Sequence, residues 1–118
     1  MKKILSILLL LAVTITYAQN KPQPKFEKQG DLVEATFYHE NGQVEQFGAF
    51  NKANKLQGTW TSYDNKGNKV AIGKYENGKK VGKWFFWTAD SLKEVDYQDN
   101  AIANVSEWEN KSTIAIAD

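Results

Sequence analysis

A repeat of about 24 residues constrains the fold of this chain more than any other feature of its sequence. Trp60, Trp84 and Trp108 lie 24 residues apart, and Gly58 and Gly82 precede the first two at the same interval. A fixed period of this length is the signature of stacked supersecondary units, none of which can bury its apolar face alone. The sequence therefore predicts an array in which each unit packs mainly on its neighbours.

Each repeat unit is expected to contain two short strands separated by turns. The units run over 37–60, 62–84 and 86–108, and the last has lost its glycines, as terminal repeats often do. The strand segments are rich in β-branched and aromatic residues, which favour β-structure. Asn-Gly pairs in several turns tolerate the positive φ of tight hairpins. The turns are expected at 39–42, 51–54, 64–68, 76–78, 88–91 and 98–100.

The predicted fold class is all-β, with a single twisted antiparallel sheet. Connections this short permit only antiparallel pairing between neighbouring strands, so the topology is a meander of stacked hairpins. The tail is expected either to add a weak strand at 113–116 or to fray. The seven main strands are expected near 32–38, 43–50, 56–63, 69–75, 81–87, 93–97 and 101–108.

Glycine stands two residues before an aromatic residue at four places in the repeat. Residues two apart on a strand share a face of the sheet, and a glycine leaves that face open to a large ring from the adjacent strand. We therefore expect a ring to cover each glycine, in a stripe that forms the core. The expected structural residues are Gly48, Phe50, Gly58, Trp60, Gly73, Tyr75, Gly82, Trp84 and Trp108.

The N-terminus has the features of a secretory signal peptide. Lys2 and Lys3 form a positive region, 4–15 is almost wholly apolar, and Thr16 and Ala18 suit cleavage after Ala18. The apolar run is too short to span a membrane comfortably, so the mature chain is expected to have no transmembrane segment and to be periplasmic or secreted. The expected organisation is a signal peptide at 1–18, an extended lead-in at 19–30, the repeat domain at 31–109 and a C-terminal tail at 110–118.

Composition excludes several classes of function. Loss of Lys2 and Lys3 leaves 13 of the 15 basic residues against 14 acidic ones, a formal net charge of −1, so no basic field attracts nucleic acid. Arginine, the usual bidentate partner of phosphate, is absent from the sequence. The absence of cysteine excludes a thiol nucleophile and cysteine-ligated metal. Neither a cofactor nor a nucleic-acid partner is predicted.

Three groups of polar residues could carry chemistry, and each has a simpler structural interpretation. His39 lies at a turn with no nucleophile or orienting group at a recognisable spacing, so a solvated turn residue is expected. Glu94 and Asp96 share a strand face, but a small hairpin array has little material for a glycosidase cleft. The segment 64–68 differs from a calcium loop because Lys66 occupies a ligand position. No catalytic or metal-binding residue is predicted, and the chain is not expected to be an enzyme.

The segment 79–87 offers the best candidate for a binding surface. Alternation places Lys83, Phe85 and Trp87 on one face of a strand, opposite the face of Trp84. An exposed column of rings suits contact with a protein, a peptide or a glycan, whereas a structural column would only stabilise strand pairing. The sequence leaves both interpretations open. The candidate surface residues are Tyr63, Lys79, Lys80, Lys83, Phe85 and Trp87.

The stretch GTWTSYDNKGNKVAIGKYENGKKVGKWFFW, residues 58–87, resembles MORN repeats in the variant form of bacterial exported proteins. It shares their recurring Gly-x-Trp, Tyr and Asn-Gly-Lys elements, well over 37–87 and poorly over 86–108. The resemblance implies an open sheet of stacked hairpins and a role in scaffolding or in contact with proteins or, in some cases, lipids. The expected function is a protein-interaction module whose partner is another protein or the chain itself. Binding of a glycan or lipid headgroup through the aromatic residues is the alternative.

Short exported chains of similar appearance are sometimes called nicotinate mononucleotide adenylyltransferases. Enzymes of that name resemble α/β proteins with a His-x-Gly-His phosphate motif, and a chain whose single histidine is His39 cannot contain that motif. The sequence also has no glycine-rich strand-to-helix loop. The residues therefore do not support this activity.

Overall fold

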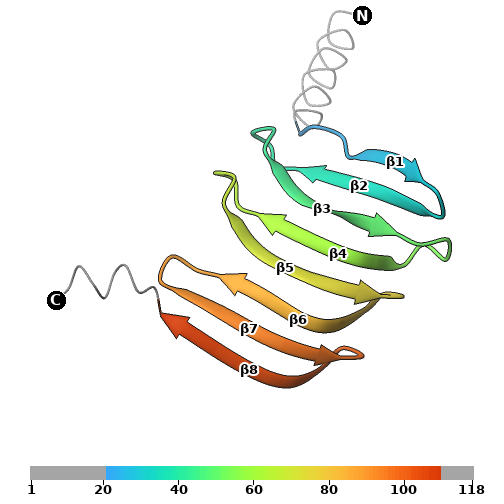
Figure 1. Cartoon of the computed structure of the whole chain (residues 1–118). Helices are drawn as coiled ribbons and strands as arrows, with labels where there is room; N and C mark the ends of the chain where they lie inside the picture. The colour runs from blue at the N-terminus through green and yellow to red at the C-terminus, as the bar shows by residue number, and fades with distance from the viewer. Residues whose placement is uncertain (1–20, 110–118) are drawn as a thin grey trace, which may run out of the picture.

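The computed structural model describes residues 21–109, so the predictions of a signal peptide at 1–18 and of a tail strand at 113–116 lie outside the described residues. The described chain forms one open sheet in which each strand pairs antiparallel with its sequence neighbours (Figure 1). This confirms the predicted all-β meander. The strands are β1 Lys25–Gln29, β2 Leu32–Tyr38, β3 Val44–Phe50, β4 Leu56–Tyr63, β5 Lys69–Glu76, β6 Lys79–Trp87, β7 Ser91–Gln98 and β8 Ala101–Glu109.

Strand β1 is the element that the sequence did not predict. It lies within 19–30, the segment expected to be an extended lead-in, and pairs with β2 from Gln29 opposite Leu32 to Lys25 opposite Thr36. Its only large apolar residue is Phe26, so it has no alternation of apolar and polar residues by which to recognise a strand. The two-residue turn Gly30-Asp31, with Gly30 at a φ of 63°, connects β1 and β2.

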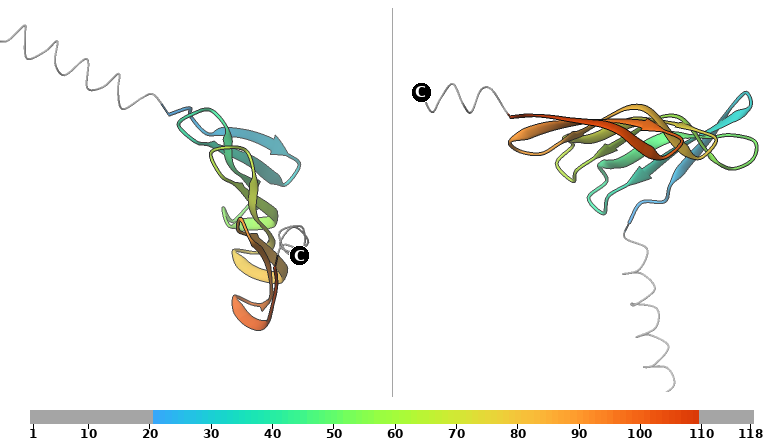
Figure 2. Two further views of the ribbon diagram at one scale, coloured as in Figure 1. Left: turned by 90° about the vertical axis from the view of Figure 1, so that its left-hand side faces the viewer. Right: turned by 90° about the horizontal axis from the view of Figure 1, so that it is seen from below.

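The sheet is a single twisted layer, and both of its faces are open in the described residues (Figure 2). We call the face that carries Trp60 and Trp84 the core face, and the face that carries Phe85 and Trp87 the outer face. Among residues 21–109 the buried hydrophobic side chains are Ala35, Trp60, Trp84 and Val95. The core of this protein is therefore a patch on one face of a sheet rather than a space between two layers.

The buried hydrophobic residues belong to a row across the core face that takes one residue from each strand and ends in exposed residues at the two edges. Directly opposed residues of an antiparallel pair share a face, and the register opposes Ala35 to Gly48, Trp60 to Gly73, and Trp84 to Val95. The same register adds one residue at each edge of the sheet. This core row consists of Phe26, Ala35, Gly48, Trp60, Gly73, Trp84, Val95 and Val105.

Two of the glycines lie under tryptophan rings, as expected. A side chain at Gly48 would overlap the indole of Trp60, and one at Gly73 would overlap the indole of Trp84. Trp60 Nε1 donates to the carbonyl of residue 49 at 3.0 Å, and Trp84 Nε1 donates to the carbonyl of residue 74 at 3.1 Å. The same arrangement thus occurs twice, one repeat apart, with the polar atom of each buried indole paired.

Gly58 and Gly82 have a different role from the one predicted. Their φ angles are 76° and 69°, and a Cβ at either would meet nothing within 4 Å, so no ring covers them. Each lies where the register with the preceding strand shifts. A glycine in the left-handed region is typical of a β-bulge, which bends and twists its strand. In each Gly-x-Trp element the glycine therefore shapes the strand, and the tryptophan covers the glycine of the preceding strand.

Trp108 does not lie on the core face, where the 24-residue interval predicts it. The register opposes Val105 to Val95 in the core row and Trp108 to Leu92 on the outer face. Ser106 stands where the earlier units have the bulge glycine, and the only register shift between β7 and β8 lies elsewhere, at Asp96 and Tyr97. Trp108 is 45% exposed and is not the structural equivalent of Trp60 and Trp84.

Polar side chains link turns that are about one repeat apart. Asn41 Nδ2 donates to the carbonyl of Asn65 at 2.6 Å, and Asn51 Nδ2 donates to Asn77 Oδ1 at 3.0 Å. The backbone N–H of Gly78 donates to the carbonyl of residue 56 at 2.8 Å. These contacts hold successive hairpins together at the margins of the sheet, where no core residue does so.

Tyr75 connects the two buried tryptophans and makes stability sensitive to alkaline pH. Its ring centroid lies 6.4 Å from that of Trp60 and 5.0 Å from that of Trp84, and burial raises the pKa of its phenol. A group whose pKa is higher in the folded state contributes stability that is fully present below its unfolded pKa. This contribution is lost as the pH rises through the folded pKa. We therefore expect the free energy of unfolding to fall as the pH rises above about 10.

Urea unfolding of the parent chain and of Tyr75→Phe at neutral and alkaline pH tests this expectation. The variant keeps the ring but has no proton to lose, so its free energy of unfolding should fall less between the two pH values. An equal fall in both chains would mean that Tyr75 does not cause the loss.

Candidate interaction surface

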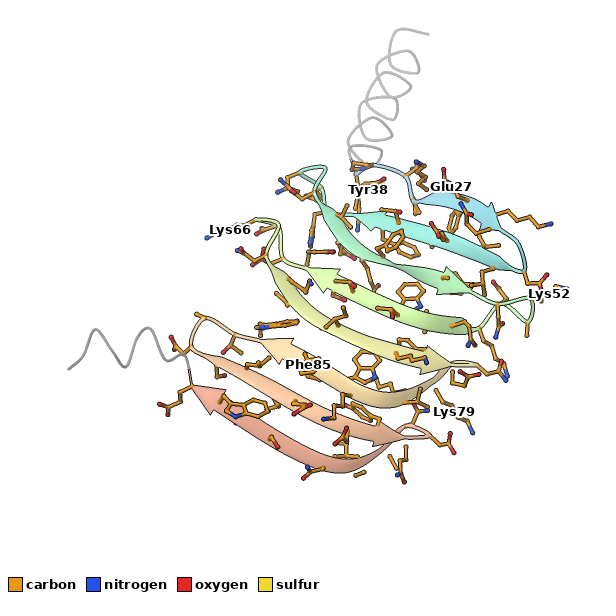
Figure 3. The ribbon with its side chains drawn as sticks, viewed as in Figure 1. Glu27, Tyr38, Lys52, Lys66, Lys79 and Phe85 are labelled. Atoms are coloured by element: carbon orange, nitrogen blue, oxygen red, sulfur yellow. The ribbon has the colours of Figure 1, made fainter. Side chains whose placement is uncertain are left out.

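The structure separates the candidate residues that lie on β6. Lys83, Phe85 and Trp87 lie on the outer face, since they are opposed to Asp96, Glu94 and Leu92 of β7. Lys80 lies on the core face, where its Nζ is 5.2 Å from the ring of Trp84 and 5.1 Å from that of Tyr97. Lys79 lies at the turn end of β6, away from Phe85 (Figure 3). Of the three candidate lysines on β6, only Lys83 therefore lies on the outer face near Phe85 and Trp87.

On the outer face, one row of side chains crosses five adjacent strands. The register opposes Tyr63 to Lys69, Trp87 to Leu92, and Leu92 to Trp108. Lys69 Nζ lies 5.8 Å from the ring of Trp87 and joins the two parts of the row. Phe85 stacks beside Trp87, with ring centroids 6.2 Å apart and an interplanar angle of 28°. We call this set the outer strip: Tyr63, Lys69, Phe85, Trp87, Leu92 and Trp108.

Charged groups border the outer strip without interrupting it. Lys83 Nζ lies 3.3 Å from Glu94 Oε1, and the Glu94 side chain is only 17% exposed while that of Lys83 is 63% exposed. The ammonium of Lys69 above the Trp87 ring adds a cation–π contact at a partly exposed position. The strip is thus apolar except at Lys69, whose ammonium lies over the Trp87 ring, and Lys83 stands at its margin.

At its β4 end the outer strip borders an open pocket of about 440 Å³. Tyr63 contributes one wall, Phe47 and Val44 contribute the apolar remainder, and Thr36 and Gln43 supply polar atoms. Phe47 is 41% exposed, so this end of the face also presents an aromatic ring to solvent. The exposed apolar surface therefore extends beyond β4 to β3.

Reasoning from the sequence missed three members of the outer strip, for identifiable reasons. Lys69 and Leu92 reach it only through the cross-strand register, which alternation within one strand does not reveal. Trp108 was assigned to the core face because the 24-residue interval was taken to preserve the face. Ser106 in place of the bulge glycine was the signal that this interval no longer applied.

The polar residues considered for chemistry have structural contacts instead. His39 lies at a turn as expected, where its backbone N–H donates to the carbonyl of Gln43, but it is less solvated than expected. Its side chain is 23% exposed, Nε2 lies 2.8 Å from the carbonyl of Tyr63, and Nδ1 lies 3.4 Å from Glu45 Oε2. Asp64 Oδ1 accepts from the backbone N–H of Lys66 and of Asn68, both at 2.9 Å. The hydrogen bond from the Asn68 N–H is the main cause that holds the pKa of Asp64 below its usual value.

Two further observations concern the described residues as a whole. Over 21–109 no three His, Cys, Asp or Glu side chains are placed to hold a metal ion. No helix in the same range has the length and apolar character needed to cross a membrane.

Comparison of the chain with protein-family models, with curated proteins and with solved structures finds no match.

Proposed function

We propose that this chain is an exported, non-catalytic β-repeat module of the MORN type, which binds a protein partner through the outer strip. The observation that carries the proposal is the outer strip, a row from β4 to β8 that is aromatic or apolar except at Lys69 on β5. No second layer of residues 21–109 lies over it: Trp108 is exposed, and Tyr63, Phe85, Trp87 and Leu92 are half-buried among their neighbours in the sheet. Contiguous exposed apolar surface of this kind marks interaction sites, and tyrosine and tryptophan are enriched at their energetic centres.

The shape of the surface favours a protein over a small ligand. Sites for small molecules are concave and enclose most of the ligand, whereas the outer strip lies on the face of a one-layer sheet. Neighbouring strands are about 4.8 Å apart, so the row from β4 to β8 is about 19 Å long. An open surface of that length on one face of a twisted sheet suits a protein face or an extended peptide.

Binding of a glycan or a lipid headgroup is the second candidate function, and one contact favours it. The cation of Lys69 above the Trp87 ring combines a positive charge with a planar apolar surface, which suits an anionic or ring-shaped ligand. The same residues would carry both functions, so the binding experiment must include both kinds of partner.

Trp87→Ala is expected to weaken partner binding by about thirtyfold, the effect of removing a residue at the energetic centre of an interface. The measurement is affinity capture from the compartment to which the chain is exported, followed by titration of the captured protein. Ile102→Ala is the matched control, because Ile102 is 61% exposed but lines a groove on the core face.

Thermal unfolding of both variants must first show that Trp87→Ala remains folded. Titration of intrinsic fluorescence with neutral glycans and with anionic vesicles forms the second arm of the experiment. Response to either ligand, without a captured protein, would replace the protein-binding proposal with the second candidate. A captured protein that binds Trp87→Ala as tightly as the parent would exclude the outer strip as the contact site.

A further inference from the structure

We propose that copies of this chain associate head to tail, with β8 of one copy pairing antiparallel with β1 of the next. Within residues 21–109, β1 and β8 each pair on one side only, and the occupant of each remaining edge is a second copy of the chain. The contact uses the edges of the sheet rather than the outer strip, so it does not depend on the function proposed above.

The first argument comes from the two ends of the core row. In the interior of the sheet this row is buried, with Ala35 at 0%, Trp60 at 3%, Trp84 at 6% and Val95 at 4% exposure. At the edges it ends in Phe26 and Val105, which are 58% and 49% exposed. Ile102, exposed beside Val105 on the same groove, enlarges the apolar surface at the β8 edge. At each edge the core row therefore lacks the neighbouring strand that buries its members in the interior of the sheet.

The second argument is geometric. Neighbouring strands alternate in direction, so β1 and β8 of an eight-stranded meander run antiparallel to each other. A second copy placed in the plane of the sheet therefore brings its β1 beside β8 in the orientation that an antiparallel ladder requires. A register that opposes Val105 to Phe26 of the second copy continues the core row from one copy into the next and buries both of these side chains.

The third argument is the charge of the two edges. Strand β1 carries Lys25, Glu27 and Lys28, a formal charge of +1, whereas β8 carries Glu107 and Glu109, a formal charge of −2. Pairing of β8 with β8 would place a strand of charge −2 beside its own copy, whereas pairing of β8 with β1 places a strand of charge −2 beside one of charge +1. Strand β8 contains neither lysine nor proline, the residues that commonly protect a free edge from pairing. Strand β1 does carry two lysines, which disfavour pairing with a second β1 but not with the acidic β8 edge.

A contact of this kind is heterologous, because each copy uses a different edge on each side. Heterologous contacts that do not close into a ring produce open-ended assemblies. The mean size of the assembly should therefore increase continuously with protein concentration. It should decrease with ionic strength, since the attraction between the edges is partly between exposed charges.

Sedimentation velocity of the processed chain, from micromolar to millimolar concentration, tests the proposal with two edge variants. Phe26→Asp blocks the β1 edge and Val105→Asp blocks the β8 edge, and the two blocked edges repel each other because both carry a negative charge at the opposed position. Each variant alone should remain monomeric, and an equimolar mixture should form a dimer and nothing larger, because only one compatible pair of edges remains. Backbone amides of β1 and β8 should gain protection from hydrogen exchange in the parent as its concentration rises.

Three results would overturn the proposal. A parent chain that stays monomeric throughout excludes it, and so does dimerisation of Phe26→Asp alone, which would indicate pairing of β8 with β8. Glu107→Lys with Glu109→Lys changes only exposed side chains and should weaken association about tenfold through charge alone; no change would also contradict it. Trp87→Ala should associate like the parent, so loss of partner binding and loss of self-association can be told apart.

Discussion

Gly73→Ala is expected to destabilise the protein by about 3 kcal/mol or more, because the added methyl group would overlap the indole ring of Trp84. The ring cannot stay where it is, so it must leave the surface of β5. It would then lose both its burial and the hydrogen bond from Nε1 to the carbonyl of Lys74. A small domain has a total stability of about 5–15 kcal/mol, so this single methyl group removes a large share of it.

Gly82→Ala is the matched control for this prediction. Gly82 also precedes a ring by two residues, but a Cβ there would meet no atom within 4 Å, and its φ is 69°. The cost is therefore backbone strain alone, about 1–2 kcal/mol. Urea unfolding followed by tryptophan fluorescence measures both values. Equal losses for the two variants would mean that overlap with Trp84 is not what makes Gly73 necessary.

The contrast between these glycines shows how much of the fold a local pattern contains. Spacing and turn residues predicted the meander and the positions of its hairpins from β2 onward, because both depend on residues close together in the chain. The same spacing predicted the same role for Gly73 and Gly82. In the structure Gly73 lies under the ring of Trp84, whereas Gly82 forms part of a β-bulge. Backbone conformation distinguishes them, and a Gly-x-aromatic pattern is identical for both.

The candidate surface was predictable to a similar extent. Alternation along β6 correctly separated Phe85 and Trp87 from Trp84, since this requires only the period of a strand. The rest of the outer strip depends on which residues of different strands are opposed. That register in turn depends on bulges, and the loss of one bulge moved Trp108 from the expected face to the other.

A one-layer sheet also explains why so few residues form its core. No second layer covers the core face in the described residues, so burial has to come from large rings that lie across neighbouring strands. Trp60 and Trp84 achieve this by lying over glycines, and edge-to-face contacts through Tyr75 link the two sites. Stability should therefore be concentrated in these few residues rather than distributed over the sheet.

Trp84→Ala tests this concentration directly and is expected to cost about 4 kcal/mol, a value typical of a buried tryptophan. Trp84 is 6% exposed, and its ring centroid lies 6.1 Å from that of Phe86 and 5.9 Å from that of Tyr97. Its removal would uncover Gly73 and leave the carbonyl of Lys74 without its indole donor. Chemical unfolding followed by circular dichroism avoids dependence on the tryptophan that is removed.

Trp108→Ala is the control, because it removes the same side chain at the next repeat interval. Trp108 is 45% exposed on the outer face of an edge strand, so its loss should cost no more than about 1 kcal/mol. The large difference follows from the register and not from the repeat, which treats the two tryptophans as equivalent. Comparable losses of stability would show that β8 packs Trp108 as the inner strands pack Trp84, and that the core row does not end at Val105.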